Sequence, residues 1–221
     1  MYIIQERMSI LSQSFIERFR SVTPSALGHW IDQGCINNRI RPLQPGLLLL
    51  GTAVTVQTVG RDSLVCHKVI DLIKPGDVIV VDRCGDQRYA CWGEMTHLAA
   101  QIAGAAGVVI DGPVTDVQAL RQSPLPVSCN GTTVLTTQFL GLGGAINVPI
   151  VCGGVVVKPG DLIFGDENGI LVIDPGDAEH LLSLAIEEEK GDQEWREGLL
   201  QGKRPSQMAP IDDLMSRRNH P

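Results

Sequence analysis

Residues 93–120, GEMTHLAAQIAGAAGVVIDGPVTDVQAL, carry the pattern that decides the fold. The first half is rich in alanine and has the periodicity of a helix, while the apolar run at 108–110 is typical of a buried strand. A second helix is expected to begin at Thr115. Another apolar run, VIVVD at 78–82, precedes this stretch. Strands that alternate with helices pair in parallel, with the helices packed against the sheet.

The pattern extends from this unit in both directions along the chain. Helices are predicted at 11–20, from Thr23-Pro24, at 62–73 and from 175, and buried strands at 46–59 and 125–129. After residue 147, short Val and Ile runs separated by Gly-Gly, Pro-Gly-Asp and Glu-Asn-Gly predict an antiparallel β layer. We therefore expect one domain of mixed β and α layers over 1–205, followed by a loose polar tail at 206–221.

The composition is that of a globular protein with an aliphatic core, because 43% of the 221 residues are hydrophobic and only 4% are aromatic. The net charge is −7 and no basic cluster precedes SRRNH near the end, so nucleic acid is not expected as a direct partner. The run LLLLGTAVTV is too short to cross a bilayer, and the first residues lack a signal-peptide pattern. These features predict a cytoplasmic protein with no membrane partner.

The six cysteines are expected to be reduced and mostly buried. None forms a Cys-x-x-Cys pair, and several lie inside apolar runs, which argues against a disulfide framework. A zinc site is also disfavoured, since no two candidate ligands have a usable short spacing.

The candidate chemistry converges at the carboxyl edge of the predicted parallel strands. Glu94 lies in the first turn of one helix and Asp116 lies just beyond the next strand, so the two carboxylates should meet there. The backbone amides of Glu94, Met95 and Thr96 are free donors at a helix N-terminus, suited to a carboxylate or phosphate, and Gly93 lets a ligand approach closely. Two carboxylates beside such a site suit Mg²⁺ or Mn²⁺.

Simpler explanations exist for the same residues. An acidic residue in the first turn of a helix often caps amides and complements the helix dipole, which would explain Glu94 and Asp116 without a metal. His67 and His97 lie beside apolar neighbours and are expected to be packing or surface histidines. Arg83 and the nearby Arg88 follow the strand at 78–82 and are expected to be solvated, although both could reach the same edge.

Three strings in order, PGDVIVVD, WGEMTHLAAQIAGAAGVVIDGPVTDVQAL and VPIVCGGVVVKPGDLIFGDENGILVID, resemble the RraA-like family. This family contains 4-hydroxy-4-methyl-2-oxoglutarate aldolases and the regulator of RNase E activity, and the likeness runs from about residue 20 to 205. The resemblance implies an α/β chain with the three-layer β/β/α swivelling-domain fold and a mixed sheet. It also implies a homotrimer or homohexamer with sites between subunits.

The aldolases of this family are metal-dependent lyases that release pyruvate from 4-carboxy-4-hydroxy-2-oxoadipate-type substrates and decarboxylate oxaloacetate. Their signature is an acidic residue, twenty further positions and then Arg-Asp, which falls here on Glu94, Thr115 and Asp116. The resemblance implies that Asp116 binds the metal, that Glu94 holds metal-bound water, and that the amides of 93–96 take the substrate carboxylate. Threonine replaces the family's arginine, and Arg88 is a candidate substitute.

The sequence is compatible with three functions. The first is a Mg²⁺- or Mn²⁺-dependent carbon–carbon lyase acting on a small 2-oxo acid, with Glu94, Asp116 and Thr115 as the catalytic residues. The second is a non-catalytic oligomeric protein that binds a protein partner, which the missing arginine favours. The third is a relative with a different substrate, for which Thr115 makes room. By resemblance, a carboxylate near Glu188 and Glu189 is also expected to reach a neighbouring subunit's site.

Overall fold

A computed structural model of the chain describes residues 1–217. Its main sheet has nine strands in the order β1-β7-β3-β4-β5-β6-β2, with β10 paired to β3 and β11 paired to β10. The strands of this sheet are β1 (Tyr2–Ile4), β2 (Arg41–Pro42), β3 (Leu49–Thr58), β4 (Asp77–Asp82), β5 (Gly107–Asp111), β6 (Val127–Cys129), β7 (Gly144–Ile146), β10 (Leu162–Gly165) and β11 (Ile170–Ile173). Strands β3, β4, β5 and β6 are parallel, as the alternation of strands and helices predicts.

The central strands are buried on both faces. Ile79 and Val81 of β4 belong to the core cluster shared with the helices on one face, whereas Val78 and Val80 pack into a second cluster on the other face. This alternation is the period of two expected for a strand, and it explains why residues 78–81 are all apolar. The helices of the chain are α1 (Gln13–Ile16), α2 (Pro24–Leu27), α3 (Leu64–Lys68), α4 (Glu94–Ile102), α5 (Val117–Gln122), α6 (Ala178–Leu200) and α7 (Ile211–Arg217), with 3₁₀ turns η1 (Glu17–Ser21), η2 (Val69–Asp71) and η3 (Pro205–Gln207).

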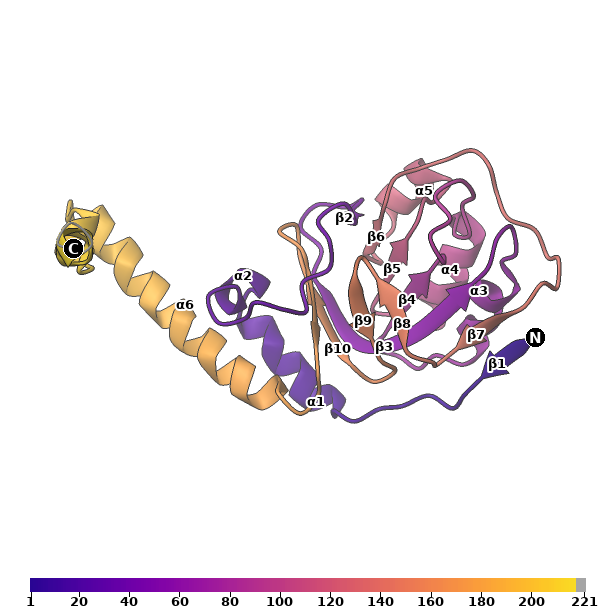
Figure 1. Cartoon of the computed structure of the whole chain (residues 1–221), viewed down its shortest axis with the longest axis horizontal. Coiled ribbons are helices and arrows are strands. Elements are labelled where there is room, and N and C mark those ends of the chain that lie inside the picture. Colours follow the sequence, from indigo (N-terminus) through magenta and orange to yellow (C-terminus); the bar gives the residue numbers. More distant parts are fainter. Residues whose placement is uncertain (218–221) are drawn as a thin grey trace.

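Three layers result, and the predicted β/β/α architecture is confirmed. Helices α3, α4 and α5 lie on one face of the main sheet (Figure 1). An antiparallel hairpin of β8 (Ile150–Cys152) and β9 (Val155–Val157) packs on the other face, as the Gly-Gly turn between its apolar runs predicts. A third cluster joins α1, α2 and the start of α6 to β10 and β11.

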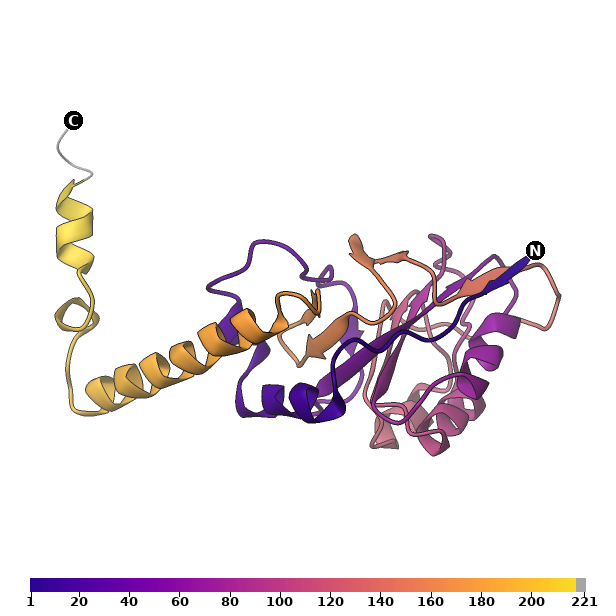
Figure 2. The ribbon, with the colours of Figure 1, turned by 90° about the horizontal axis from the view of Figure 1, so that it is seen from below.

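Helix α6 leaves the body of the molecule as a long arm (Figures 1 and 2). Its middle is tied to the N-terminal region of the same chain. The Glu189 carboxylate accepts hydrogen bonds from the amide and hydroxyl of Thr23, both at 2.8 Å, and Glu188 accepts one from the Trp30 indole at 3.2 Å. These two carboxylates are therefore already engaged within their own chain.

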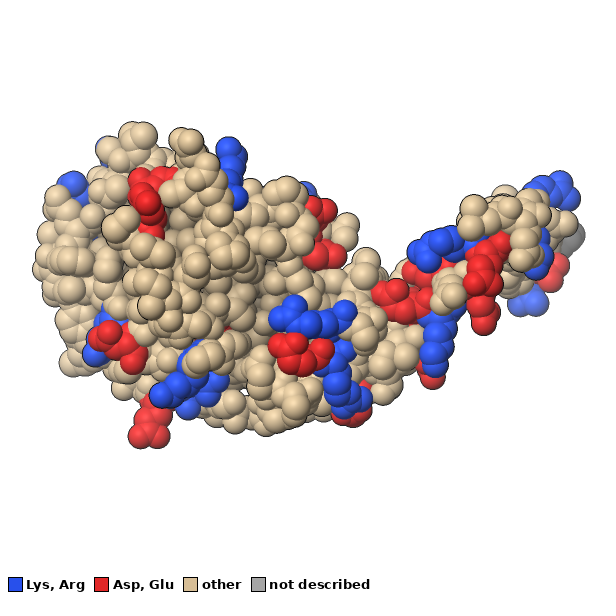
Figure 3. All heavy atoms as spheres, turned by 180° about the vertical axis from the view of Figure 1, so that it is seen from behind, with Lys and Arg blue, Asp and Glu red and all other residues tan. Residues whose placement is uncertain are grey.

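The segment after Lys203 is more ordered than the sequence predicts. The expected loose tail at 206–221 contains the end of η3 and all of α7, and only residues 218–221 lie outside the described part of the chain. Within the described residues, no helix combines the length and apolar character needed to cross a membrane. Basic and acidic side chains are interspersed over the face seen in Figure 3, without a continuous basic patch.

Candidate functional site

Asp116 and Glu94 meet at the carboxyl edge of the main sheet, as the topology predicts. Glu94 is the first residue of α4, and Asp116 lies at the start of α5. The Asp116 Oδ2 atom accepts a hydrogen bond from the Glu94 amide, with a nitrogen–oxygen distance of 3.0 Å. Although Asp116 is the N-cap residue of α5, its side chain accepts no hydrogen bond from the described backbone amides of that helix. Asp116 therefore caps a helix other than its own, so the capping and ligand-binding explanations are not exclusive.

The local backbone brings the two residues together. Asp116 has a left-handed conformation with φ of 53°, which aspartate tolerates better than most residues. The Thr115 amide donates to the Trp92 carbonyl at 3.0 Å, which holds the chain after β5 against the start of α4. A Cβ atom on Gly93 would come within 2.5 Å of Asp116 Oδ2 and 2.7 Å of Thr115 Cγ2. Only glycine at position 93 permits this approach.

The predicted set of three free amides is reduced to two. The Glu94 amide is occupied by Asp116, because the carboxylate that was expected to face the amides binds one of them. No acceptor for the amides of Met95 and Thr96 is found within residues 1–217. These two donors at the positive end of the α4 dipole remain suited to a carboxylate.

A cavity of about 270 Å³ opens beside this edge. Its walls include Gly93, Met95, Thr96, Thr115 and Asp116, so five of the predicted site residues surround one space. The other lining residues are Ser63, His67, Ala90, Cys91, Trp92, Thr136, Thr137, Gln138 and Phe139. Glu94 faces a neighbouring hollow, which it shares with Asp116.

Two histidines that the sequence assigns to packing or the surface have defined polar partners. His67 lines the cavity, and its Nε2 atom lies 3.2 Å from the Thr96 hydroxyl. His97 is buried, accepts a hydrogen bond from the Trp92 indole at 3.3 Å, and contacts Ser123 Oγ at 2.9 Å. Burial lowers the pKa of His97. His97 is the packing residue that the sequence predicts, whereas His67 belongs to the cavity.

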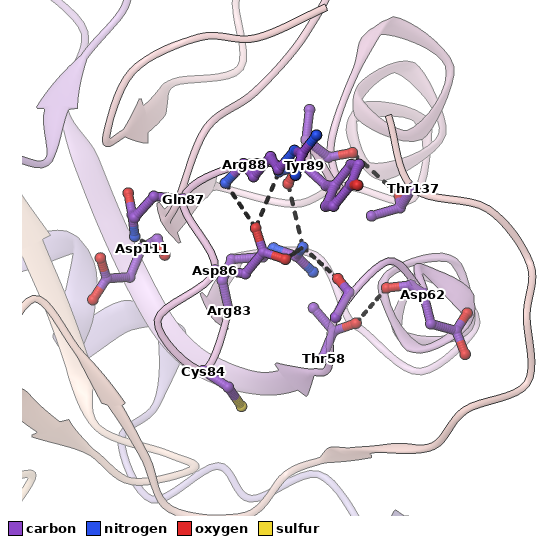
Figure 4. A network of polar contacts seen from close by, with 12 residues as sticks. Thr58, Asp62, Arg83, Cys84, Asp86, Gln87, Arg88, Tyr89, Asp111 and Thr137 are labelled. Atoms are coloured by element: carbon purple, nitrogen blue, oxygen red, sulfur yellow. Dashed lines mark hydrogen bonds and ion pairs between the residues drawn. The ribbon is translucent and has the colours of Figure 1, made fainter. Parts of the chain in front are cut away.

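The two arginines after β4 have different environments (Figure 4). The prediction that Arg83 is solvated is wrong: its side chain is fully buried, and its Nη2 atom donates to the carbonyls of Gly60 at 2.7 Å and Tyr89 at 3.2 Å. The aliphatic part of the Arg83 side chain fits because residue 112 is glycine: a Cβ there would lie 2.6 Å from Arg83 Cγ. Arg88 lies over the Tyr89 ring and does not line the cavity.

The donor set of the site is suited to a hard cation held by few protein atoms. The second carboxylate oxygen of Asp116 has only a long contact of 3.5 Å with the Thr115 hydroxyl, which leaves it able to accept a ligand. No cluster of three or more His, Cys, Asp or Glu side chains able to hold a metal occurs in the described part of the chain. A bound Mg²⁺ or Mn²⁺ would therefore keep several water or substrate oxygens, as Mg²⁺ commonly does.

The fold and this edge site define an RraA-like protein. The sequence model of the RraA-like family, described as Aldolase/RraA, matches residues 26–172, and the chain belongs to this family. A Halalkalibacterium halodurans protein, provisionally named a 4-hydroxy-4-methyl-2-oxoglutarate aldolase, is 38% identical over 188 residues, which cover 84% of this chain and 89% of the relative.

Solved structures of the same fold include members with a different kind of name. An uncharacterized protein from Pseudomonas syringae superposes with a TM-score of 0.78 at 26% identity, covering 92% of this chain and 96% of the other. Streptomyces coelicolor RraAS2, described as an unusual member of the RNase ES inhibitor RraA protein family, superposes with a TM-score of 0.75 at 26% identity, covering 85% and 98%. The family thus contains relatives named as aldolases and relatives named as inhibitors.

Proposed function

We propose that this protein is a divalent-metal-dependent carbon–carbon lyase that releases pyruvate from a small 2-oxo acid, such as 4-hydroxy-4-methyl-2-oxoglutarate or oxaloacetate. The observation that supports this most strongly is the position of Asp116. Its carboxylate is fixed at the N-terminus of α4 and opens onto a cavity. By resemblance, this is also the position of the family's metal-binding aspartate.

Asp116 is the residue that would hold Mg²⁺ or Mn²⁺, with Glu94 bound through water. Such a cation polarises a substrate carbonyl and stabilises the charge of an enolate. The Asp116 side chain is exposed and keeps one carboxylate oxygen free of strong hydrogen bonds, as a ligand must. The hydrogen bond from Glu94 fixes the orientation of the carboxylate relative to the cavity.

The substrate carboxylate would bind the free amides of Met95 and Thr96. A cavity of about 270 Å³ lies at the small end of ligand pockets, which typically measure roughly 300–1,000 Å³, and suits a small organic acid. Thr115 lines the cavity where the family's aldolases have arginine, so the site lacks one cationic donor. We expect slower turnover or a different preferred substrate as a result.

The exposed apolar side chains fit an assembly of several copies, and we propose a homotrimer or homohexamer. Met95, Leu98 and Ile102 form an exposed stripe on α4, and Phe139 and Leu142 are exposed on the segment after β6. Monomeric proteins seldom expose apolar patches of this kind. The second candidate function, a non-catalytic binding protein, is favoured specifically by the threonine at position 115.

The test is pyruvate release by the full chain from oxaloacetate and from 4-hydroxy-4-methyl-2-oxoglutarate, with Mn²⁺ or with EDTA. The proposed lyase releases pyruvate with Mn²⁺ and stops with EDTA. If neither substrate yields pyruvate in Mn²⁺, the lyase is rejected and the binding protein becomes the better explanation.

A further inference from the structure

The hydrogen bonds of His67 define which of its ring nitrogens can accept a proton. Nδ1 lies 3.0 Å from the Ser63 carbonyl oxygen, which can only accept a hydrogen bond, so Nδ1 carries the proton in the neutral ring. Nε2 is then an acceptor, and the Thr96 hydroxyl at 3.2 Å donates to it. An edge-to-face contact with the Phe139 ring, with 4.7 Å between the ring centroids, holds the imidazole in place. His67 is therefore oriented with a basic nitrogen toward Thr96.

The pair lies on the wall of the candidate site. Both His67 and Thr96 line the same cavity as Thr115 and Asp116, although α3 and α4 contribute them from different parts of the chain. Thr96 is buried within α4, and its hydroxyl has no other partner among residues 1–217 than His67. A hydroxyl whose proton points at an imidazole can pass that proton on and take another from a ligand.

We infer that Thr96 and His67 form the proton acceptor for the hydroxyl group of a 4-hydroxy-2-oxo acid. This inference rests on the proposed function and assigns its base. The Thr96 hydroxyl touches the substrate, and His67 acts through it. Neither Thr96 nor His67 is one of the aldolase signature positions, which are Glu94, Thr115 and Asp116.

The step balances with water as the only other reagent. The proton of the substrate C4 hydroxyl passes to Thr96 Oγ1 while the Thr96 proton passes to His67 Nε2. The C3–C4 bond breaks, its electron pair forms the enolate of pyruvate, and the C4–oxygen bond becomes a carbonyl. Water then protonates C3 of the enolate, which leaves as pyruvate, and the imidazolium gives its proton back to the resulting hydroxide.

Two reactions of the same site differ in their need for this base. Cleavage of a 4-hydroxy-2-oxo acid requires removal of a hydroxyl proton. Decarboxylation of oxaloacetate also passes through the pyruvate enolate, but its leaving group is an ionised carboxylate with no proton to remove. Loss of the base should therefore impair the first reaction much more than the second.

The experiment measures both reactions with Mn²⁺ in the wild-type chain and in His67→Gln, Thr96→Val and Thr96→Ser. His180→Gln, an exposed histidine on α6, is the matched control. We expect His67→Gln and Thr96→Val to lower kcat for hydroxy-acid cleavage by about 10²-fold or more, the usual contribution of a general base, while oxaloacetate decarboxylation changes little. Thr96→Ser, which keeps the hydroxyl, should retain cleavage, and His180→Gln should behave as wild type.

Two results overturn the inference in distinguishable ways. If the wild type is active and His67→Gln and Thr96→Val slow both reactions equally, or slow neither reaction, the pair is not the base. Only this inference then fails. If the wild type releases pyruvate from neither substrate, the proposed function fails and the assigned base fails with it.

Discussion

Asp116 caps α4 through the Glu94 amide, at 3.0 Å and across 22 positions of sequence, while standing at the start of α5. One carboxylate thus joins two helices at the carboxyl edge of the sheet. The hydrogen bond uses only one of its oxygens, and the other is available to a ligand. The capping role is therefore compatible with the proposed metal-binding role of the same residue.

Gly93→Ala should disrupt this relationship, because the new Cβ would come within 2.5 Å of Asp116 Oδ2. We expect destabilisation of about 1–3 kcal/mol, as for other overpacked positions, together with lower pyruvate release. Gly191→Ala in α6 is the matched control, since a Cβ there meets no atom within 4 Å among the described residues. That variant should be stabilised by roughly 0.5–1 kcal/mol. Urea unfolding of both variants checks this, and equal effects would contradict the crowding.

Thr115→Arg should raise the rate of pyruvate release, because it restores a cationic donor to the cavity wall beside Asp116. Removal of one such electrostatic donor commonly costs about 10²–10³ in rate, so a gain of up to that size is expected. Steady-state kinetics on both substrates measure it. An unchanged or lower kcat would contradict this prediction and show that an arginine at position 115 does not assist the reaction.

The stability of the protein should fall as the pH is lowered below about 6.5, the ordinary pKa of histidine. Burial lowers the pKa of His97 in the folded protein. Just below pH 6.5, His97 is therefore protonated in the unfolded chain but not in the folded chain, which favours unfolding. The Asp62 and Asp174 carboxylates, whose pKa values are lowered, act only at more acidic pH. Thermal unfolding of wild type and His97→Gln between pH 5 and 8 checks this. An equal pH dependence in both would refute the assignment.

Native alkylation should distinguish the cysteines by burial. Cys35 and Cys84 are exposed, whereas the other four thiols are buried. Desolvation raises the pKa of Cys129 to about 11, which suppresses its reactive thiolate. Burial and the nearby Asp82 raise the pKa of Cys84, so Cys35 should react first with iodoacetamide. Peptide mass spectrometry reads the order, and early labelling of Cys129 would contradict this packing.

Much of the fold follows from local pattern. The apolar runs at β4 and β5 and the alanine-rich helix between them predict the parallel unit, and the Gly-Gly turn predicts the β8–β9 hairpin. Strands β1, β2 and β7 were missed because each has only two or three residues and forms by pairing with distant segments. Helix α7 was missed although Ile211, Leu214 and Met215 have helical spacing, because the segment is short and its surroundings are polar.

The candidate site could be predicted only where topology determines it. Glu94 and Asp116 were placed together because parallel strands end at one edge. The role of His67 depends on α3 lying beside α4, which no local pattern gives. The burial of Arg83 depends on space at Gly112, a signal visible in the sequence only as an unremarkable Asp-Gly-Pro turn.

The most direct test of a metal site at Asp116 is a Mn²⁺ titration followed by electron paramagnetic resonance, with wild type, Asp116→Asn and the half-buried loop control Asp166→Asn. Asparagine keeps the size, the amide-accepting oxygen and the tolerance of a left-handed backbone, so the fold should persist. We predict that wild type and Asp166→Asn bind Mn²⁺ alike and that Asp116→Asn binds it at least about tenfold more weakly, as expected when a charged ligand is lost. Equal Mn²⁺ binding by Asp116→Asn and wild type, or no binding by the wild type, would contradict the account.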